Sequence, residues 1–298
     1  MLVHIIIAGF IALVPTFLFI ILIINRKEKS ESRFKRMVSE YNKPPAYSLD
    51  AKKTDLMFNL FLKMSGLIAL PLMLISLLGS LSLPLAVISS ILATASCFYF
   101  AKKDVDQVYR LKKGIRAELL VGMSLESGLD SRFTILHDFQ LGSDYSHGSN
   151  IDHLVIGPRC IYIVETKYKS CPLGKDSQLK FDGEFVTAPD GYKSDQHIKQ
   201  VQGLIKQFKD YCKREFDITE IPVNIDAFIV YPGWCVDFSN AKYNSSAASN
   251  IKVNAHEQMI KAMKTVAGRE RSWANTTTQD ELVRHLTKKN KVKIKLTR

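Results

Sequence analysis

Residues 150–167 read Asn-Ile-Asp-His-Leu-Val-Ile-Gly-Pro-Arg-Cys-Ile-Tyr-Ile-Val-Glu-Thr-Lys, and this stretch decides the fold. Two runs rich in β-branched and other apolar residues, 151–157 and 160–167, lie on either side of Pro158-Arg159. Such runs favour strands, and a short turn between them is typical of a β-hairpin. We therefore expect two antiparallel strands joined by a tight turn at Pro158-Arg159.

Three charged side chains have defined positions in this hairpin. Counting outward from the turn places Asp152 opposite Glu165. Residues two apart in a strand share a face, so Glu165 and Lys167 point the same way. Two carboxylates on one face are the oxygen ligands that Mg²⁺ takes, with Mn²⁺ as an alternative ion. A bound metal and a nearby lysine are what metal-assisted phosphodiester hydrolysis requires.

The alternative interpretation is a solvated ion pair at a sheet edge. Such a Glu-x-Lys pair contributes about 0–1 kcal/mol and carries no chemistry. The strand that ends in this pair contains Ile161, Ile163 and Val164 and is therefore expected to be largely buried. Charges at the end of a buried strand favour a functional site over a solvated edge.

The two segments 150–157 and 161–167, containing Ile-Asp-His-Leu-Val-Ile-Gly and Val-Glu-Thr-Lys, resemble the nuclease-related domain, called NERD. That family resembles the PD-(D/E)xK nuclease superfamily. The resemblance covers about residues 112–232. It implies an α/β fold of the restriction-endonuclease type, with a mixed central sheet flanked by helices.

The same resemblance extends to a helix before the hairpin. Residues 114–118, Gly-Ile-Arg-Ala-Glu, are similar to the opening GxxGE helix of the family, with Ala117 in place of its second glycine. The resemblance implies that Glu118 is the acid of this helix. The metal ligands it implies are Glu118, Asp152 and Glu165.

A further polar residue is implied after the hairpin. Residues 196–200, Gln-His-Ile-Lys-Gln, match the final glutamine of the family's Asn-Pro-x-x-Gln helix start but lack Asn-Pro. The tryptophan common between the ExK strand and this helix is also absent. The resemblance implies that Gln200 supports the site, while Lys167 assists the attacking water.

Further elements are expected on both sides of the hairpin, and all strands are expected to form one central sheet. The apolar spacing and the turn residues predict helices at 104–120, 195–214, 256–266 and 278–286, strands at 133–139, 223–231 and 291–296, and a short hairpin at 179–186. Thr278 and Glu281 have the spacing of a capping box.

The first third of the chain differs from the rest. Residues 1–100 carry 10 Lys/Arg and 5 Asp/Glu and most of the apolar residues, whereas residues 101–298 carry 31 Lys/Arg and 24 Asp/Glu. Three uncharged apolar runs predict transmembrane helices at about 2–24, 64–79 and 82–100. For the first run, a cleaved signal peptide is the alternative, but no cleavage site follows it. For the other two, the alternative is a buried hairpin of a soluble fold.

We predict three regions from this asymmetry. They are a membrane region at 1–103 with a basic cytoplasmic loop at 25–56, a nuclease-like domain at 104–235, and a C-terminal extension at 236–298 that is helical and ends in a basic tail. Basic residues flank the spans on the side of the soluble domain, so the positive-inside rule predicts an integral inner or plasma membrane protein. Its N-terminus is expected outside and its soluble domain in the cytoplasm, with the lipid bilayer as a partner.

Several classes of function are disfavoured. Five cysteines without a CxxC pair argue against a disulfide framework and a structural zinc site. His256-Glu257 lacks the second histidine of a zinc protease motif, and the chain has no phosphate-binding loop of the GxxxxGK[ST] type. No nucleotide cofactor is therefore expected.

The sequence thus predicts a membrane-anchored, Mg²⁺-dependent deoxyribonuclease that acts on the cytoplasmic side. The net charge of +12 fits a polyanionic partner such as DNA. The basic tail suits nucleic-acid phosphates, anionic lipid head groups or no partner at all. The alternative function is a catalytically silent nuclease-fold module that binds nucleic acid or serves as a membrane scaffold.

Overall fold

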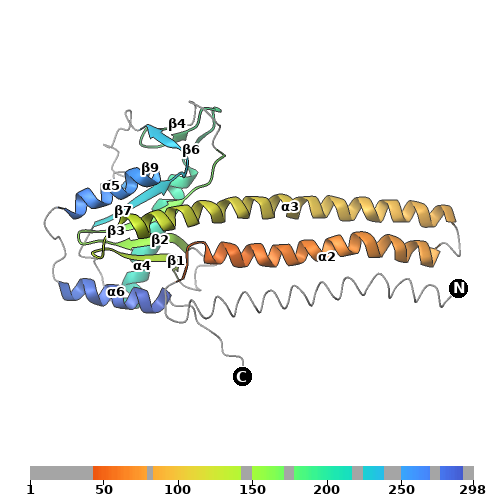
Figure 1. The fold of residues 1–298 in the computed structure, drawn as a ribbon, viewed down its shortest axis with the longest axis horizontal. Coiled ribbons are helices and arrows are strands. Elements are labelled where there is room, and N and C mark those ends of the chain that lie inside the picture. Colours follow the sequence, from red (N-terminus) through yellow and green to blue (C-terminus); the bar gives the residue numbers. More distant parts are fainter. Residues whose placement is uncertain are drawn as a thin grey trace, which may run out of the picture. The chain divides into compact units, whose positions relative to one another are not determined.

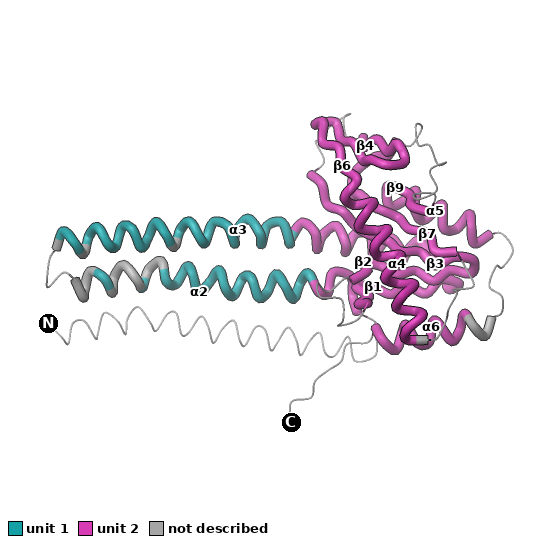
Figure 2. Tube along the Cα trace, turned by 180° about the vertical axis from the view of Figure 1, so that it is seen from behind, with its two compact units in different colours: residues 1–39, 49–112 teal, residues 40–48, 113–298 magenta. Residues whose placement is uncertain are grey.

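The computed structural model describes residues 43–78, 83–141, 150–170, 178–216, 224–237, 250–268 and 276–290. They divide into two compact units (Figure 2). The first contains residues 49–112. The second contains residues 43–48 together with the described residues from 113 onward.

The first unit consists of two long helices, α2 (Tyr47–Leu78) and α3 (Leu83–Gly128), whose ends extend into the second unit. An ion pair of 2.6 Å between Lys63 and Asp104 joins α2 to α3. The helix α2 begins at Tyr47, so the predicted loop 25–56 is helical in its last part. Within the described residues, no helix combines the length and hydropathy that a membrane span requires. The predicted span 2–24 lies outside the described residues.

The second unit is built on a mixed five-stranded sheet of order β1-β2-β3-β7-β9, which confirms the predicted α/β class (Figure 1). Its strands are β1 (Thr134–Gln140), β2 (Asn150–Ile156), β3 (Cys160–Thr166), β7 (Asn224–Val230) and β9 (Ile251–Asn254). The first three pair antiparallel, while β7 runs parallel to both β3 and β9. A parallel neighbour requires a crossover, and a helix between β3 and β7 supplies it.

The hairpin has the predicted register. His153 lies opposite Val164, and Ile156 lies opposite Ile161, on either side of the Pro158-Arg159 turn. Continued by one position, this register places Asp152 opposite Glu165. The turn residues and the apolar pattern of both strands are sufficient to fix this pairing.

The prediction of one central sheet is wrong, because a second, four-stranded sheet of order β6-β5-β4-β8 is present. Its strands are β4 (Gln178–Phe181), β5 (Val186–Thr187), β6 (Lys193–Ser194) and β8 (Cys235–Asp237). The predicted hairpin 179–186 forms its β4–β5 part. The inward side chains Leu179 and Val236 join the same apolar core as the main sheet. The small sheet is therefore packed onto the domain rather than aligned with its strands.

Helices cover both faces of the main sheet (Figure 1). The helix α4 (Gln196–Phe216) and the helix α6 (Thr276–Asn290) pack on one face, with Val201, Phe208 and Leu286 buried in its core. On the other face, the end of α3 packs beside α5 (His256–Ala267). The result is a three-layer α/β/α arrangement.

Two further predictions need correction in the C-terminal region. The helix α6 begins at Thr276, two residues before the predicted start at Thr278. The extension is not only helical, because β8 and β9 contribute to the two sheets. The predicted strand 291–296 and the basic tail lie outside the described residues.

Candidate active site

The candidate site forms where β2 and β3 meet on the face covered by α4. Asp152 lies on the same face of β2 as Leu154. Glu165 lies on the same face of β3 as Ile163. Both apolar neighbours belong to the core beneath α4. Only 7% of Asp152 and 3% of Glu165 is exposed. Two buried carboxylates thus share one face of a hairpin, as the sequence predicts.

The backbone of β3 holds the Asp152 side chain in place. The Thr166 N–H donates a hydrogen bond of 2.7 Å to Oδ2 of Asp152. Burial, followed by the negative charges of Glu165 and Glu118, raises the pKa of Asp152 well above its usual range, although this hydrogen bond acts in the opposite direction. The Asp152 carboxyl group is therefore positioned before any ligand arrives, but its charge is disfavoured unless a cation joins it.

Two donors meet at one oxygen of Glu165. Lys167 Nζ lies 2.7 Å and Gln200 Nε2 lies 2.8 Å from Oε1 of Glu165. The other oxygen, Oε2, is buried and has no hydrogen-bond partner among the residues that the structure describes. Burial raises the pKa of Glu165, whereas Lys167 and Gln200 oppose this shift. The structure thus brings Lys167 and Gln200 to the acid with which the sequence associates them.

Glu118 is on α3 and is 6% exposed. Its pKa is raised to about 8 by burial and by the negative charges of Asp138 and Glu165, while Lys167 and a hydrogen bond from the Ala46 N–H lower it. Glu118 therefore lies within the electrostatic field of the hairpin acids.

The acids of the site are of the chemical type that binds a divalent cation. Buried Oε2 of Glu165 lacks a partner, and a cation would provide one. Burial raises the pKa of all three acids, and the negative charges of neighbouring carboxylates raise it further at Glu118 and Asp152. Within the described residues, however, no group of three or more His, Cys, Asp or Glu side chains is close enough to hold a metal ion. The three acids therefore interact electrostatically, but in this structure they do not form a complete set of metal ligands.

A family comparison covers this whole site. Residues 113–232 match the model of NERD, the nuclease-related domain. The matched segment begins in α3, ends just after β7 and contains Glu118, Asp152, Glu165, Lys167 and Gln200. No curated protein and no solved structure matches the chain.

The second unit contains a second polar cluster that the sequence analysis did not predict. Asp138 adopts a left-handed backbone conformation, with φ of 49°, in the middle of β1. Its carboxylate accepts hydrogen bonds from Ser48 Oγ at 2.8 Å and from Asn150 Nδ2 at 2.6 Å. Lys43 Nζ reaches its carbonyl oxygen at 3.4 Å. The short segment 43–48 therefore packs against the matched segment, near Asp138 and Glu118.

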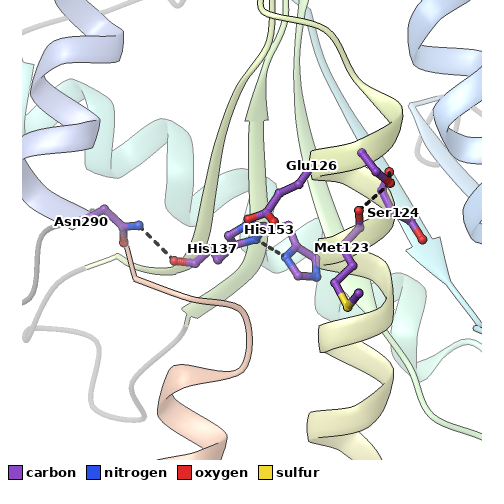
Figure 3. A network of polar contacts seen from close by, with 7 residues as sticks. Met123, Ser124, Glu126, His137, His153 and Asn290 are labelled. Carbon is purple, nitrogen blue, oxygen red and sulfur yellow. Dashed lines mark hydrogen bonds and ion pairs between the residues drawn. The ribbon is translucent and has the colours of Figure 1, made fainter. Parts of the chain in front are cut away.

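A chain of hydrogen bonds crosses the opposite face of the sheet (Figure 3). Nε2 of His137 lies 3.0 Å from Oε1 of Glu126, and its Nδ1 lies 2.8 Å from Nδ1 of His153. Nε2 of His153 is 3.4 Å from Oγ1 of Thr166, whose N–H holds Asp152. The chain therefore ends at the residue that positions a site acid. The available signal in the sequence was a histidine inside each of two apolar strands, His137 in β1 and His153 in β2.

The C-terminal helix reinforces this cluster. Asn290 Nδ2, in the last turn of α6, donates a hydrogen bond of 3.0 Å to the carbonyl oxygen of His137 (Figure 3). Asn290 is buried, although it follows two lysines and reads as part of a solvated helix end in the sequence. Residues outside the matched NERD segment thus support its first strand.

Proposed function

We propose that this protein is a Mg²⁺-dependent nuclease that hydrolyses DNA phosphodiester bonds. One observation carries the proposal. Two buried carboxylates, Asp152 and Glu165, share one hairpin face, and the ammonium group of Lys167 contacts Glu165 at 2.7 Å. The match to the nuclease-related domain over residues 113–232 supports the same reaction class.

The roles of the side chains follow from their chemistry. Glu118, Asp152 and Glu165 would hold Mg²⁺ or Mn²⁺, since these ions prefer carboxylate oxygens. When bound, such an ion makes a water more acidic and offsets charge on the phosphate. The hydrogen bond from Thr166 fixes the orientation of Asp152.

Lys167 and Gln200 would act around the same carboxylate. Gln200 donates to Oε1 of Glu165 and thereby limits its rotation. Lys167 is a hydrogen-bond donor with a full positive charge, so it can orient the attacking water and stabilise the negative charge that develops on the phosphate oxygens.

We further propose that the first unit attaches the protein to a lipid bilayer, with the nuclease domain on the cytoplasmic side. The exposed apolar side chains of α3 support this attachment, because water-exposed rows of this kind are costly in solution. They include Leu85, Ile88, Ile91, Leu92, Phe98 and Phe100. An inner or plasma membrane location with the N-terminus outside follows from the basic residues that flank the apolar runs.

Nicking of a supercoiled plasmid by the full chain with Mg²⁺ tests the proposed reaction. Asp152→Asn and Lys167→Met are the test variants. Lys199→Met is the matched control, because Lys199 is an exposed lysine of α4 that pairs only with nearby Asp195 among its described ion pairs. We expect nicking by the wild type and the control, and at least about a 100-fold loss in both test variants. Equal nicking by all four proteins would refute the proposed site.

A second function is favoured by one observation. The described residues contain no ready cluster of three metal-ligating side chains. A nuclease fold that binds DNA or serves as a membrane scaffold without turnover would need none. Salt-sensitive DNA binding that is independent of Mg²⁺ and unchanged in Asp152→Asn, without nicking, would favour this alternative.

A further inference from the structure

Two exposed tyrosines lie near the candidate site in the nuclease unit. Tyr168 directly follows Lys167 and is 47% exposed, and Tyr192 directly precedes β6 and is 43% exposed. The other large aromatic side chains of this unit that the structure describes are mostly buried, for example Tyr162 and Phe208. These two exposed rings therefore differ from the other aromatic side chains of this unit.

Each of these rings is paired with a lysine. Lys113 Nζ lies 5.2 Å from the centroid of the Tyr168 ring. Lys169 Nζ lies 4.5 Å from the centroid of the Tyr192 ring. Because Lys169 follows Tyr168 in the chain, the two Lys–Tyr pairs are connected by one peptide bond. The surface combines π-faces with positive charge.

The backbone that carries this surface is fixed at two points. The Lys167 N–H donates a hydrogen bond of 2.9 Å to the Val230 carbonyl oxygen. The indole Nε1–H of Trp234 donates a hydrogen bond of 3.0 Å to the carbonyl oxygen of Lys169. Tyr168 is therefore held at a constant position relative to Lys167 and Glu165.

The local charge is also favourable for a polyanion. A hydrogen bond with Ser170, assisted by the positive charges of Lys113 and Arg116, lowers the pKa of the Tyr168 phenol. Asp190, beside Tyr192 on this surface, is paired with Lys169 at 3.0 Å. Phosphate groups would therefore meet a surface that is positive on balance.

We propose that Tyr168 and Tyr192 form a stacking platform for the bases of single-stranded nucleic acid. Aromatic rings stack on any unpaired base, whereas the bases of an intact duplex are already stacked and inaccessible. The lysines would neutralise the flanking phosphates. This inference rests on the proposed nuclease function. It adds a substrate class, because it makes DNA with unpaired bases the preferred substrate.

Fluorescence anisotropy of the full chain in EDTA tests the platform without cleavage. The probes are a labelled single-stranded oligonucleotide and the same sequence as a blunt duplex. We expect Tyr168→Ala and Tyr192→Ala each to weaken single-strand binding about ten-fold, with less than about a two-fold effect on the duplex. Tyr168→Phe and Tyr192→Phe keep the ring and should restore single-strand binding. Tyr109→Ala, at an exposed tyrosine of the first unit, is the matched control and should bind like the wild type.

An oligonucleotide with abasic positions provides a second readout. The wild type should bind it as weakly as the alanine variants bind the normal strand, because no base remains to stack. Unchanged binding in the alanine variants, or an equal loss on the duplex and the single strand, would overturn the platform. Nicking is measured separately, so a chain that binds through the tyrosines but does not cut would remove the proposed reaction and leave the platform intact.

Discussion

The Nδ1 atoms of His137 and His153 lie 2.8 Å apart on the sheet face that is opposite to the site acids. One of these nitrogens must donate and the other must accept. If Nε2–H of His137 donates to Glu126, then Nδ1 of neutral His137 is an acceptor. Nδ1–H of neutral His153 can donate to it, so every hydrogen bond of the pair is formed. Both rings are buried, and burial lowers both pKa values.

This pair predicts a loss of stability in acid. A histidine whose folded-state pKa is lowered stabilises the fold above its unfolded pKa, near 6.5, and this contribution is lost as the pH falls below that value. We expect the free energy of unfolding of the wild type to fall relative to that of His153→Gln between about pH 6.5 and 5. Urea unfolding in EDTA across this range measures the difference. A constant difference between the two proteins would contradict the prediction.

Glu118 predicts a dependence of the opposite sign. Its folded-state pKa of about 8 lies above its unfolded value, so its stabilising contribution is complete below about pH 4.5 and is lost as the pH rises through 8. Without metal, the wild type should lose stability relative to Glu118→Gln between pH 5 and 8.5. Thermal unfolding in EDTA measures this change. Parallel curves for the two proteins would show that Glu118 is not electrostatically strained.

The same carboxyl groups predict that metal binding releases protons. Glu118, whose pKa is raised to about 8, retains a proton near pH 7, and a divalent ion must displace it. Calorimetric titration with Mn²⁺ in two buffers of different ionisation enthalpy should give different apparent heats and indicate net proton release. Affinity should increase from pH 6 to 8. Identical heats in both buffers would contradict proton-coupled binding.

A substitution in α3 tests whether the segment 43–48 packs as part of the second unit. A Cβ at Gly122 would lie 2.5 Å from Cγ of Pro45, closer than two carbon atoms can approach. Gly122→Ala should therefore lower the free energy of unfolding by about 1–3 kcal/mol. Gly203→Ala in α4 is the matched control. A Cβ at Gly203 meets nothing within 4 Å, so this variant should gain up to about 1 kcal/mol. Equal stability of the two variants would indicate that Pro45 does not pack there.

The hairpin was predictable because its signals are local. Two apolar runs and the Pro158-Arg159 turn define one register, and that register places Asp152 opposite Glu165 without knowledge of the rest of the chain. The position of Gln200 beside Glu165 was accessible only through the family resemblance, because 35 residues separate the two side chains.

The remaining features depend on contacts that no local pattern reveals. Strands of two residues such as Val186–Thr187 are too short for a detectable alternation, so the second sheet was missed. Ser48 and Asp138 are 90 residues apart in sequence, and only the folded chain brings them together. Asp138 also occupies a left-handed conformation inside a strand, a position that sequence propensities assign to regular β-structure.

Asp152→Asn separates the structural contribution of the acid from its proposed chemistry. Asparagine keeps an oxygen that can accept the Thr166 N–H, and burial already disfavours the charged form of Asp152. The variant should therefore be as stable as the wild type in EDTA, or more stable. Its nicking activity should fall by at least about 100-fold. Unfolding and cleavage measured on one preparation distinguish the two effects. A marked loss of stability would indicate that the carboxylate itself supports the fold.

Binding of Mn²⁺ to the full chain, followed by the loss of the free-ion EPR signal, tests the central claim most directly. That claim is that Glu118, Asp152 and Glu165 share a divalent ion next to Lys167. We predict that the wild type removes Mn²⁺ from solution, that Mg²⁺ competes with it, and that Asp152→Asn and Glu165→Gln lose this binding. Equal Mn²⁺ binding by the wild type and both variants, or none by the wild type, would contradict the claim.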